Sequence, residues 1–225
     1  MVAIFSKTLK NNRMKHLSII LVLLFSLCSI VSCAKGKESK ANKTQETSGM
    51  KTDKKVLVTF FSHTGENYAV GNISKGNTHI VAEMIAEATG GKLFEITPVK
   101  EYPKTYDACT DVAKQEKETK ARPAIKEDIA VEDYDVVFIG YPIWWGDMPM
   151  PVYTFIEKHH WQGKTVIPFC THEGSGLDNT EQYIADACKG ATVEKGLAIK
   201  GSIAQNKQEQ AKKTVLEWLK STIKE

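Results

Sequence analysis

Three short, nearly continuous apolar runs constrain the fold of this chain most strongly. They are Val56-Leu57-Val58-Thr59-Phe60-Phe61, Val136-Val137-Phe138-Ile139 and Val166-Ile167-Pro168-Phe169-Cys170. A strand with one solvent-exposed face alternates apolar and polar residues, so a continuous apolar run indicates a strand that is covered on both faces. Residues 93–96 and 193–199 form weaker runs and predict edge strands.

Amphipathic segments separate these runs and predict helices. The first has Asn77 or Thr78 as its cap and Gly90 as its stop, and others are expected over 106–120, 149–159, 183–190 and 211–223. Strands that alternate with helices predict an α/β fold with a doubly wound, five-stranded parallel sheet of order 2-1-3-4-5 and helices on both faces. Pro168 conflicts with a central strand, so it predicts a bulge or the end of a pairing.

The first 33 residues differ in composition from the rest of the chain. They contain four bases and no acid, and an apolar run over 17–31 is shorter than the ~20 residues of a membrane-spanning helix. A basic start followed by a short apolar core is typical of a secretory signal, which begins at Met1 or Met14. The run ends in Ile30-Val31-Ser32-Cys33. This tetrapeptide resembles the lipobox of bacterial lipoproteins, and the resemblance implies cleavage before Cys33 and lipidation of its thiol.

Two alternatives for the leader remain open: ordinary cleavage beside a bystander cysteine, or an uncleaved anchor helix. The lipoprotein interpretation divides the chain into a signal peptide over residues 1–33, a flexible polar tether over 34–54 and a folded domain over 55–225. It predicts a protein that is exported and lipid-anchored to the periplasmic or extracellular face of a bacterial membrane. After the four bases of the leader, 26 bases face 27 acids, so nothing indicates a nucleic-acid partner.

Cysteine usage argues against a disulfide framework or a metal site. The five cysteines show no CxxC spacing, and two of them, Cys28 and Cys33, belong to the leader. The remaining three are an odd number, so at least one thiol is expected to be free. Buried, inert thiols are the favoured interpretation of all three.

Three predicted loops at one edge of the sheet carry the candidate site. In an open parallel sheet, ligands bind outside the carboxyl ends of the strands. The loop after the first strand reads Ser62-His63-Thr64-Gly65-Glu66-Asn67, makes an excursion, and reaches Asn77-Thr78 at a helix start. Hydroxyls, amides and free helix N–H groups suit an anion, and the lack of a Walker lysine argues against nucleotide triphosphate hydrolysis.

The other two loops favour a flat ligand. The loop after the third strand reads Gly140-Tyr141-Pro142-Ile143-Trp144-Trp145-Gly146, and tandem tryptophans in a loop suit stacking on a planar ring. One of them is expected to pack under the loop. The loop after the fourth strand reads Cys170-Thr171-His172-Glu173-Gly174-Ser175-Gly176. His172 and Glu173 are either an acid–base pair or a solvated pair.

Together these three motifs resemble those of the flavodoxin family over residues 55–219. The resemblance implies a flavodoxin-like fold that holds FMN as cofactor, with the phosphate in the first loop and the ring between the second and third. Carried over by position, the phosphate would be bound by Ser62, Thr64, Gly65, Asn77 and Thr78. The ring would lie between Pro142, Trp144, Trp145 and Gly146 on one side and Thr171, His172, Glu173 and Gly174 on the other. Further cofactor-binding candidates in these loops are His63, Asn67 and Ile143.

The excursion over residues 66–75 departs from the family pattern, which runs directly from Thr-Gly into the helix. Either the excursion leaves and returns, with Asn77 and Thr78 completing the site, or Asn67 substitutes for them and the excursion is a lid.

The resemblance implies electron transfer or FMN-dependent oxidoreduction outside the cytoplasm, with no catalytic nucleophile. Two alternatives are an NAD(P)H-dependent quinone reductase and a flavin-free binding lipoprotein of the same fold. The sequence identifies no electron donor or acceptor, and it predicts membrane contact through the lipid anchor alone.

Overall fold

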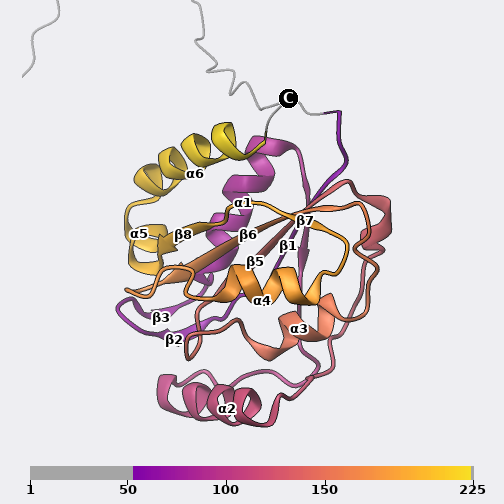
Figure 1. The fold of residues 1–225 in the computed structure, drawn as a ribbon. Helices are drawn as coiled ribbons and strands as arrows, with labels where there is room; N and C mark the ends of the chain where they lie inside the picture. Colours follow the sequence, from indigo (N-terminus) through magenta and orange to yellow (C-terminus); the bar gives the residue numbers. More distant parts are fainter. Residues whose placement is uncertain (1–52, 224–225) are drawn as a thin grey trace, which may run out of the picture. The chain divides into compact units, whose positions relative to one another are not determined.

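The computed structural model describes residues 53–223 (Figure 1). The predicted signal peptide, the lipidation site Cys33 and nearly all of the predicted tether lie outside these residues. Between residues 53 and 223, no helix is both long enough and apolar enough to cross a bilayer.

A parallel sheet organises the domain. Its strands are β1 (Val56–Phe60), β4 (Lys92–Glu95), β5 (Val136–Pro142), β6 (Thr165–His172), β7 (Thr192–Val193) and β8 (Leu197–Lys200). The order is β4-β1-β5-β6, and both β7 and β8 pair with the outer side of β6. All these pairs are parallel. The predicted order is therefore confirmed, with the difference that two short strands share the fifth position.

Pro168 explains why the fifth strand is interrupted. On one side of β6 the ladder with β5 is continuous, and Pro168 pairs with Ile139. On the other side, β7 pairs with Thr165 and Val166, and β8 pairs with residues 169–172. The break between β7 and β8 thus lies opposite Pro168, which has no N–H to donate to a ladder. Of the two predictions for Pro168, the end of a pairing is confirmed.

Helices cover both faces of the sheet, as the continuous apolar runs predict. One face packs against α1 (Asn77–Thr89), α5 (Gly201–Asn206) and α6 (Gln208–Thr222). The other packs against α2 (Tyr106–Thr119), α3 (Met150–Ile156) and α4 (Thr180–Ala187), and a short 3-10 helix, Val131–Asp133, precedes β5 (Figure 1). Neighbouring residues such as Leu57 and Val58 enter opposite cores and are both fully buried.

The excursion after β1 is a small hairpin of β2 (Gly65–Asn67) and β3 (Gly71–Ile73), which pair antiparallel. The chain then returns to the end of β1, where Gly76 lies close to Ser62. A Cβ placed on Gly76 would lie only 2.1 Å from Ser62 Oγ. Only glycine permits this approach. The excursion therefore leaves and returns, as the first of the two alternatives predicts for the path of the chain.

Helix α1 begins one residue earlier than predicted. Its N-cap is Gly76 rather than Asn77 or Thr78, and Ser62 Oγ accepts the N–H of His79 at 3.1 Å. A side chain from the preceding loop thus takes the place of a capping residue. The helix ends at Gly90 in the left-handed conformation, as predicted.

The three described cysteines, Cys109, Cys170 and Cys188, are free and buried. Burial raises the pKa of Cys109 to about 11 and the pKa values of the other two to about 12. They are therefore protonated at neutral pH, which confirms the interpretation of inert thiols.

Candidate cofactor-binding site

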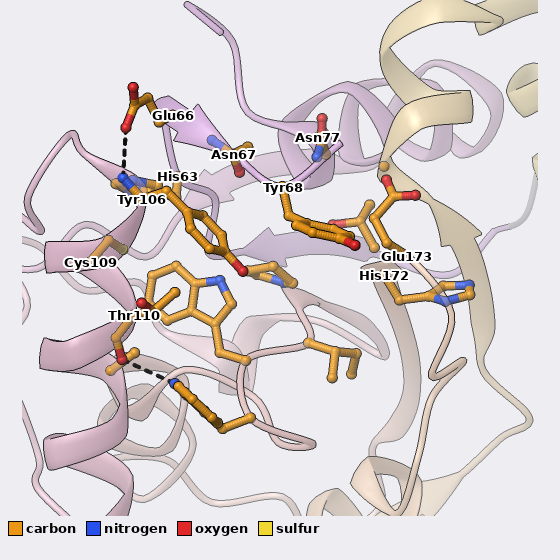
Figure 2. A pocket seen from close by; sticks show the side chains of 17 residues that line it. His63, Glu66, Asn67, Tyr68, Asn77, Tyr106, Cys109, Thr110, His172 and Glu173 are labelled. Carbon is orange, nitrogen blue, oxygen red and sulfur yellow. Dashed lines mark hydrogen bonds between the residues drawn. The ribbon is translucent and has the colours of Figure 1, made fainter. Parts of the chain in front are cut away.

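A cavity of about 280 Å³ opens where β1, β5 and β6 end (Figure 2). Residues from all three predicted loops line it, so the tandem tryptophans and the first loop lie at the same edge of the sheet. Ten of the predicted site residues contribute to the lining: His63, Asn67, Asn77, Pro142, Ile143, Trp144, Trp145, Thr171, His172 and Glu173. Six do not: Ser62, Thr64, Gly65, Thr78, Gly146 and Gly174.

Three of these six belong to the first loop and have structural contacts of their own. Ser62 caps α1. The hydroxyl of Thr64 accepts a hydrogen bond from Lys104 Nζ at 2.9 Å, and Gly65 starts the hairpin with a φ of 102°. A Cβ on Gly65 would lie 2.6 Å from the carbonyl oxygen of Lys104. These residues shape the loop beside the cavity.

The other three support residues that do line the cavity. Thr78 is buried and shares a 2.8 Å hydrogen bond with the hydroxyl of Thr171. Gly146 has a φ of 71° in the turn that follows the tryptophans, and Gly174 donates its N–H to His172.

Trp144 is held rigidly by three other rings. Its ring centroid lies 5.0 Å from that of Tyr102, 5.3 Å from Phe61 and 5.8 Å from His63, each in an edge-on arrangement. The backbone of Trp144 also exchanges two hydrogen bonds with Asp147 across a tight turn. Trp144 is half-buried by these contacts, and the exposed part of the residue lines the cavity.

Trp145 has a different environment. It is 51 % exposed and adopts a φ of 55°, which is uncommon for a bulky residue. Its indole N–H donates to the carbonyl of Thr110 at 3.0 Å, and Lys114 Nζ lies 5.5 Å from the ring centroid. The indole is thus fixed against α2. The expectation that one tryptophan packs under the loop is met by Trp144, but both rings line the cavity.

His172 and Glu173 both line the cavity and are both held by hydrogen bonds to neighbouring groups. His172 Nδ1 accepts the N–H groups of Gly174 and Gly176, both at 3.0 Å, so it carries no proton and the neutral ring is protonated on Nε2. Burial lowers the pKa of His172. Glu173 accepts hydrogen bonds from the N–H and the hydroxyl of Ser202, at 2.6 and 2.9 Å. It therefore ties the third loop to the start of α5.

Two buried polar atoms on the cavity have no hydrogen-bond partner within the described part of the chain. They are His63 Nε2 and Asn77 Oδ1. An unpaired buried polar group costs about 1–3 kcal/mol, so a ligand that pairs with both would gain from them. The oxygen and nitrogen of an asparagine amide are assigned from the network, so Asn77 offers either an acceptor or a donor.

Helix α1 adds backbone donors beside these atoms. The first N–H groups of a helix have no partner within the helix. Ser62 Oγ takes that of His79 and Gly76 O takes that of Ile80, and no described residue pairs with those of Asn77 and Thr78, which are left for a ligand. A helix N-terminus with free amides suits an anionic group.

His63 predicts a pH dependence of stability. Burial, and secondly the charge of Lys104, lower the pKa of His63 to about 4 in the folded protein. The unfolded chain therefore binds this proton at a higher pH than the folded one, and stability is lost as the pH falls from about 6.5 to about 4. We expect a loss on the order of 1–3 kcal/mol after allowance for partial solvent screening. Chemical denaturation of the wild type and of His63→Gln at both pH values measures it. An equal pH dependence in the two proteins would contradict the role of His63.

The sequence profile of the flavodoxin family matches residues 55–219. This chain belongs to the flavodoxin family. It is similar to two solved Bacteroides structures that are provisionally classed as flavoproteins. The B. eggerthii structure is 32% identical with a TM-score of 0.60, and the alignment covers 76% of this chain and 100% of that one. The B. uniformis structure is 32% identical with a TM-score of 0.59, with 74% and 98% covered.

A flavoprotein from Lactobacillus acidophilus, solved in complex with FMN, shares the fold of this flavodoxin-family member. It is 21% identical with a TM-score of 0.52, and 67% of this chain and 96% of that chain are aligned. No curated protein matches the chain significantly.

Sequence reasoning missed several residues that line the cavity of this flavodoxin-family domain. They come from the hairpin, from α2 and from the start of α5: Glu66, Tyr68, Tyr106, Cys109, Thr110, Ala113 and Gly201. The sequence of α2 resembles that of an ordinary polar surface helix, so nothing in it marks these residues as part of a site. Tyr68 alone gave a signal, because it is a large aromatic residue inside an insertion of the first loop.

Proposed function

We propose that this chain binds FMN in the cavity and acts in electron transfer or as an FMN-dependent oxidoreductase. The observation that carries this proposal is the convergence of three loops on one cavity where His63 Nε2 and Asn77 Oδ1 are buried and have no partner among residues 53–223. Membership of the flavodoxin family supports it. FMN bears hydroxyls and a phosphate that need donors and acceptors, and a flat ring that needs an aromatic wall, so the lining residues fit it.

Each end of the cavity suits a different part of the cofactor. The N-terminus of α1, with Asn77, would hold the phosphate through backbone and side-chain donors. Trp144, with Pro142 and Ile143, would support one face of the ring. Bound FMN supplies the redox chemistry, and the chain's residues supply binding, orientation and electrostatics.

A flavin titration tests the proposal directly. The purified chain is titrated with FMN while flavin absorption and fluorescence are followed. We expect a shifted absorption band and saturable binding of one FMN per chain. A chain that takes up no flavin would instead favour a binding lipoprotein that has kept the fold without the cofactor.

Asn77→Asp is expected to separate phosphate binding from ring binding. An aspartate at the first position of α1 suits the helix dipole, which offsets part of the cost of burying a carboxylate at this position, and thermal denaturation checks that the variant is folded. The new carboxylate would repel the phosphate, and we expect FMN affinity to fall by roughly 1.5–3 kcal/mol, the range for a hydrogen bond to a charged group. Riboflavin, which lacks the phosphate, should bind with little change. Equal losses for FMN and riboflavin would contradict the placement of the phosphate at α1.

Stopped-flow reduction by NAD(P)H distinguishes a carrier from a reductase. A flavin in the protein that is reduced no faster than free FMN would exclude the NAD(P)H-dependent quinone reductase. Fast reduction would favour it over simple electron transfer.

The proposal extends to the leader: Cys33 is lipidated and anchors the exported domain to a membrane. The sequence Ile30-Val31-Ser32-Cys33 after a short apolar run supports it. Expression in a bacterium with labelled palmitate should give labelled protein in the membrane fraction. Cys33→Ala should abolish the label and Cys28→Ala should retain it. Label in the Cys33→Ala protein would refute the assignment.

A further inference from the structure

The β2–β3 hairpin is a fixed part of the cavity wall. Near its base, the N–H of Glu66 donates to the carbonyl of Lys104 at 2.7 Å, and Glu66 Oε2 accepts the N–H of Tyr106 at 2.9 Å. Beyond its second strand, Gln205 Nε2 donates to the carbonyl of Lys75 at 2.6 Å. The hairpin is therefore attached to the start of α2 on one side and to α5 on the other.

This anchoring holds Tyr68 over the cavity. Tyr68 follows β2 directly, and Figure 2 shows its side chain and that of Tyr106 pointing into the cavity. The two ring centroids lie 6.1 Å apart with 35° between their planes. Tyr68 is 66 % exposed, more than any other large apolar side chain in the described part of the domain. A large ring left exposed at a cavity mouth suits contact with a ligand.

The third loop contributes no Phe, Tyr or Trp side chain to the cavity. Its cavity residues are Thr171, His172 and Glu173, of which the last two are held by backbone or serine donors. Residues 174–176 are Gly-Ser-Gly. A flat ring supported by Trp144 on one face would thus find no Phe, Tyr or Trp ring from this loop on the other, and the imidazole of His172 is held at Nδ1 by two backbone N–H groups.

We infer that Tyr68 supplies the outer aromatic wall of the ring site, so that the hairpin inserted in the phosphate loop also determines ring binding. This inference rests on the proposed function, because it takes FMN as the occupant. The position of Tyr68 is fixed by Glu66, which joins the hairpin to the first N–H of α2. A ring bound against Tyr68 is expected to stabilise residues 66–74 further.

Replacement of Tyr68 tests the inference. Tyr68→Ala in the full chain should weaken FMN and riboflavin to the same extent, by about tenfold, because the ring and not the phosphate is affected. Bound flavin should also fluoresce more strongly, since a stacked tyrosine quenches the flavin ring. Tyr68→Phe should bind within about twofold of the wild type, because it keeps the aromatic face. Val99→Ala is the matched control, since Val99 is 58 % exposed and does not line the cavity.

A second readout uses hydrogen exchange of the wild-type chain. Flavin should protect the amides of residues 66–74 from exchange. If the wild type binds FMN and Tyr68→Ala binds it with the same affinity and the same flavin fluorescence, the inference is overturned and the proposed function stands. A wild type that takes up no flavin would overturn both. Binding that weakens for FMN but not for riboflavin would also overturn it, because the contact would then be with the phosphate.

Discussion

Trp144→Ala is expected to weaken flavin binding by about 1–3 kcal/mol, which corresponds to roughly 5- to 150-fold in the dissociation constant. The substitution removes a ring that lines the cavity and that is fixed by edge contacts to Phe61, His63 and Tyr102. A ring fixed before the ligand arrives loses little freedom on binding, so its stacking energy is largely retained. Fluorescence titration with FMN measures the change.

Trp145→Ala is the matched control for this experiment. Its indole is held against α2 by Thr110 and Lys114 and is half-exposed, so we expect a loss of at most about threefold. Trp144→Phe should retain most of the affinity because it keeps a flat ring. Wild-type affinity in Trp144→Ala would show that this ring does not support the flavin.

Gly140→Ala is expected to lower the free energy of unfolding by about 1–3 kcal/mol, the usual range for an overpacked core. Gly140 lies in β5 beside Phe169 of β6, and an added Cβ would lie 2.1 Å from the Cζ atom of that ring. The ring is fully buried, so it cannot move aside into solvent. Thermal denaturation should show a melting temperature lower by about 2–4 °C for each kcal/mol.

Two further variants test whether the clash with the Phe169 ring causes the loss of stability. Gly174→Ala should be nearly neutral for stability, because no atom lies within 4 Å of its added Cβ and its φ is not positive. Adding Phe169→Leu to Gly140→Ala should recover part of the loss, because the smaller side chain leaves room for the methyl group. If the two substitutions were strictly additive, the clash would not be the cause.

The elements that local sequence patterns describe were predicted well. Leu57 and Val58 lie next to each other in the sequence and are both buried, as a two-sided strand requires. Gly90 ends α1 where the apolar stripe ends. Pro168 marked the place where one ladder stops, because the missing N–H is a property of the residue itself.

The contacts made by individual site residues were predicted less well. The sequence did not indicate that the hydroxyl of Ser62 caps α1. Glu173 was considered as an acid or base, yet Ser202 occupies both of its oxygens. Each of these contacts joins residues far apart in the chain, and no local periodicity encodes such a pairing. The hairpin was likewise present in the sequence only as an unexplained excursion.

The sequence by itself determined the strand–helix alternation, the sheet order and the three loops that meet at one edge, because burial periodicity and turn residues act over a few neighbouring positions and parallel strands bring their carboxyl ends together. The family followed from the resemblance of the three loop motifs, which lie within short stretches of sequence. Only the tertiary structure decided that Tyr68 reaches the cavity, that Trp144 is held by three rings, and that His63 Nε2 and Asn77 Oδ1 find no partner in the described domain. Those outcomes depend on which distant side chains compete for the same space and the same hydrogen bonds.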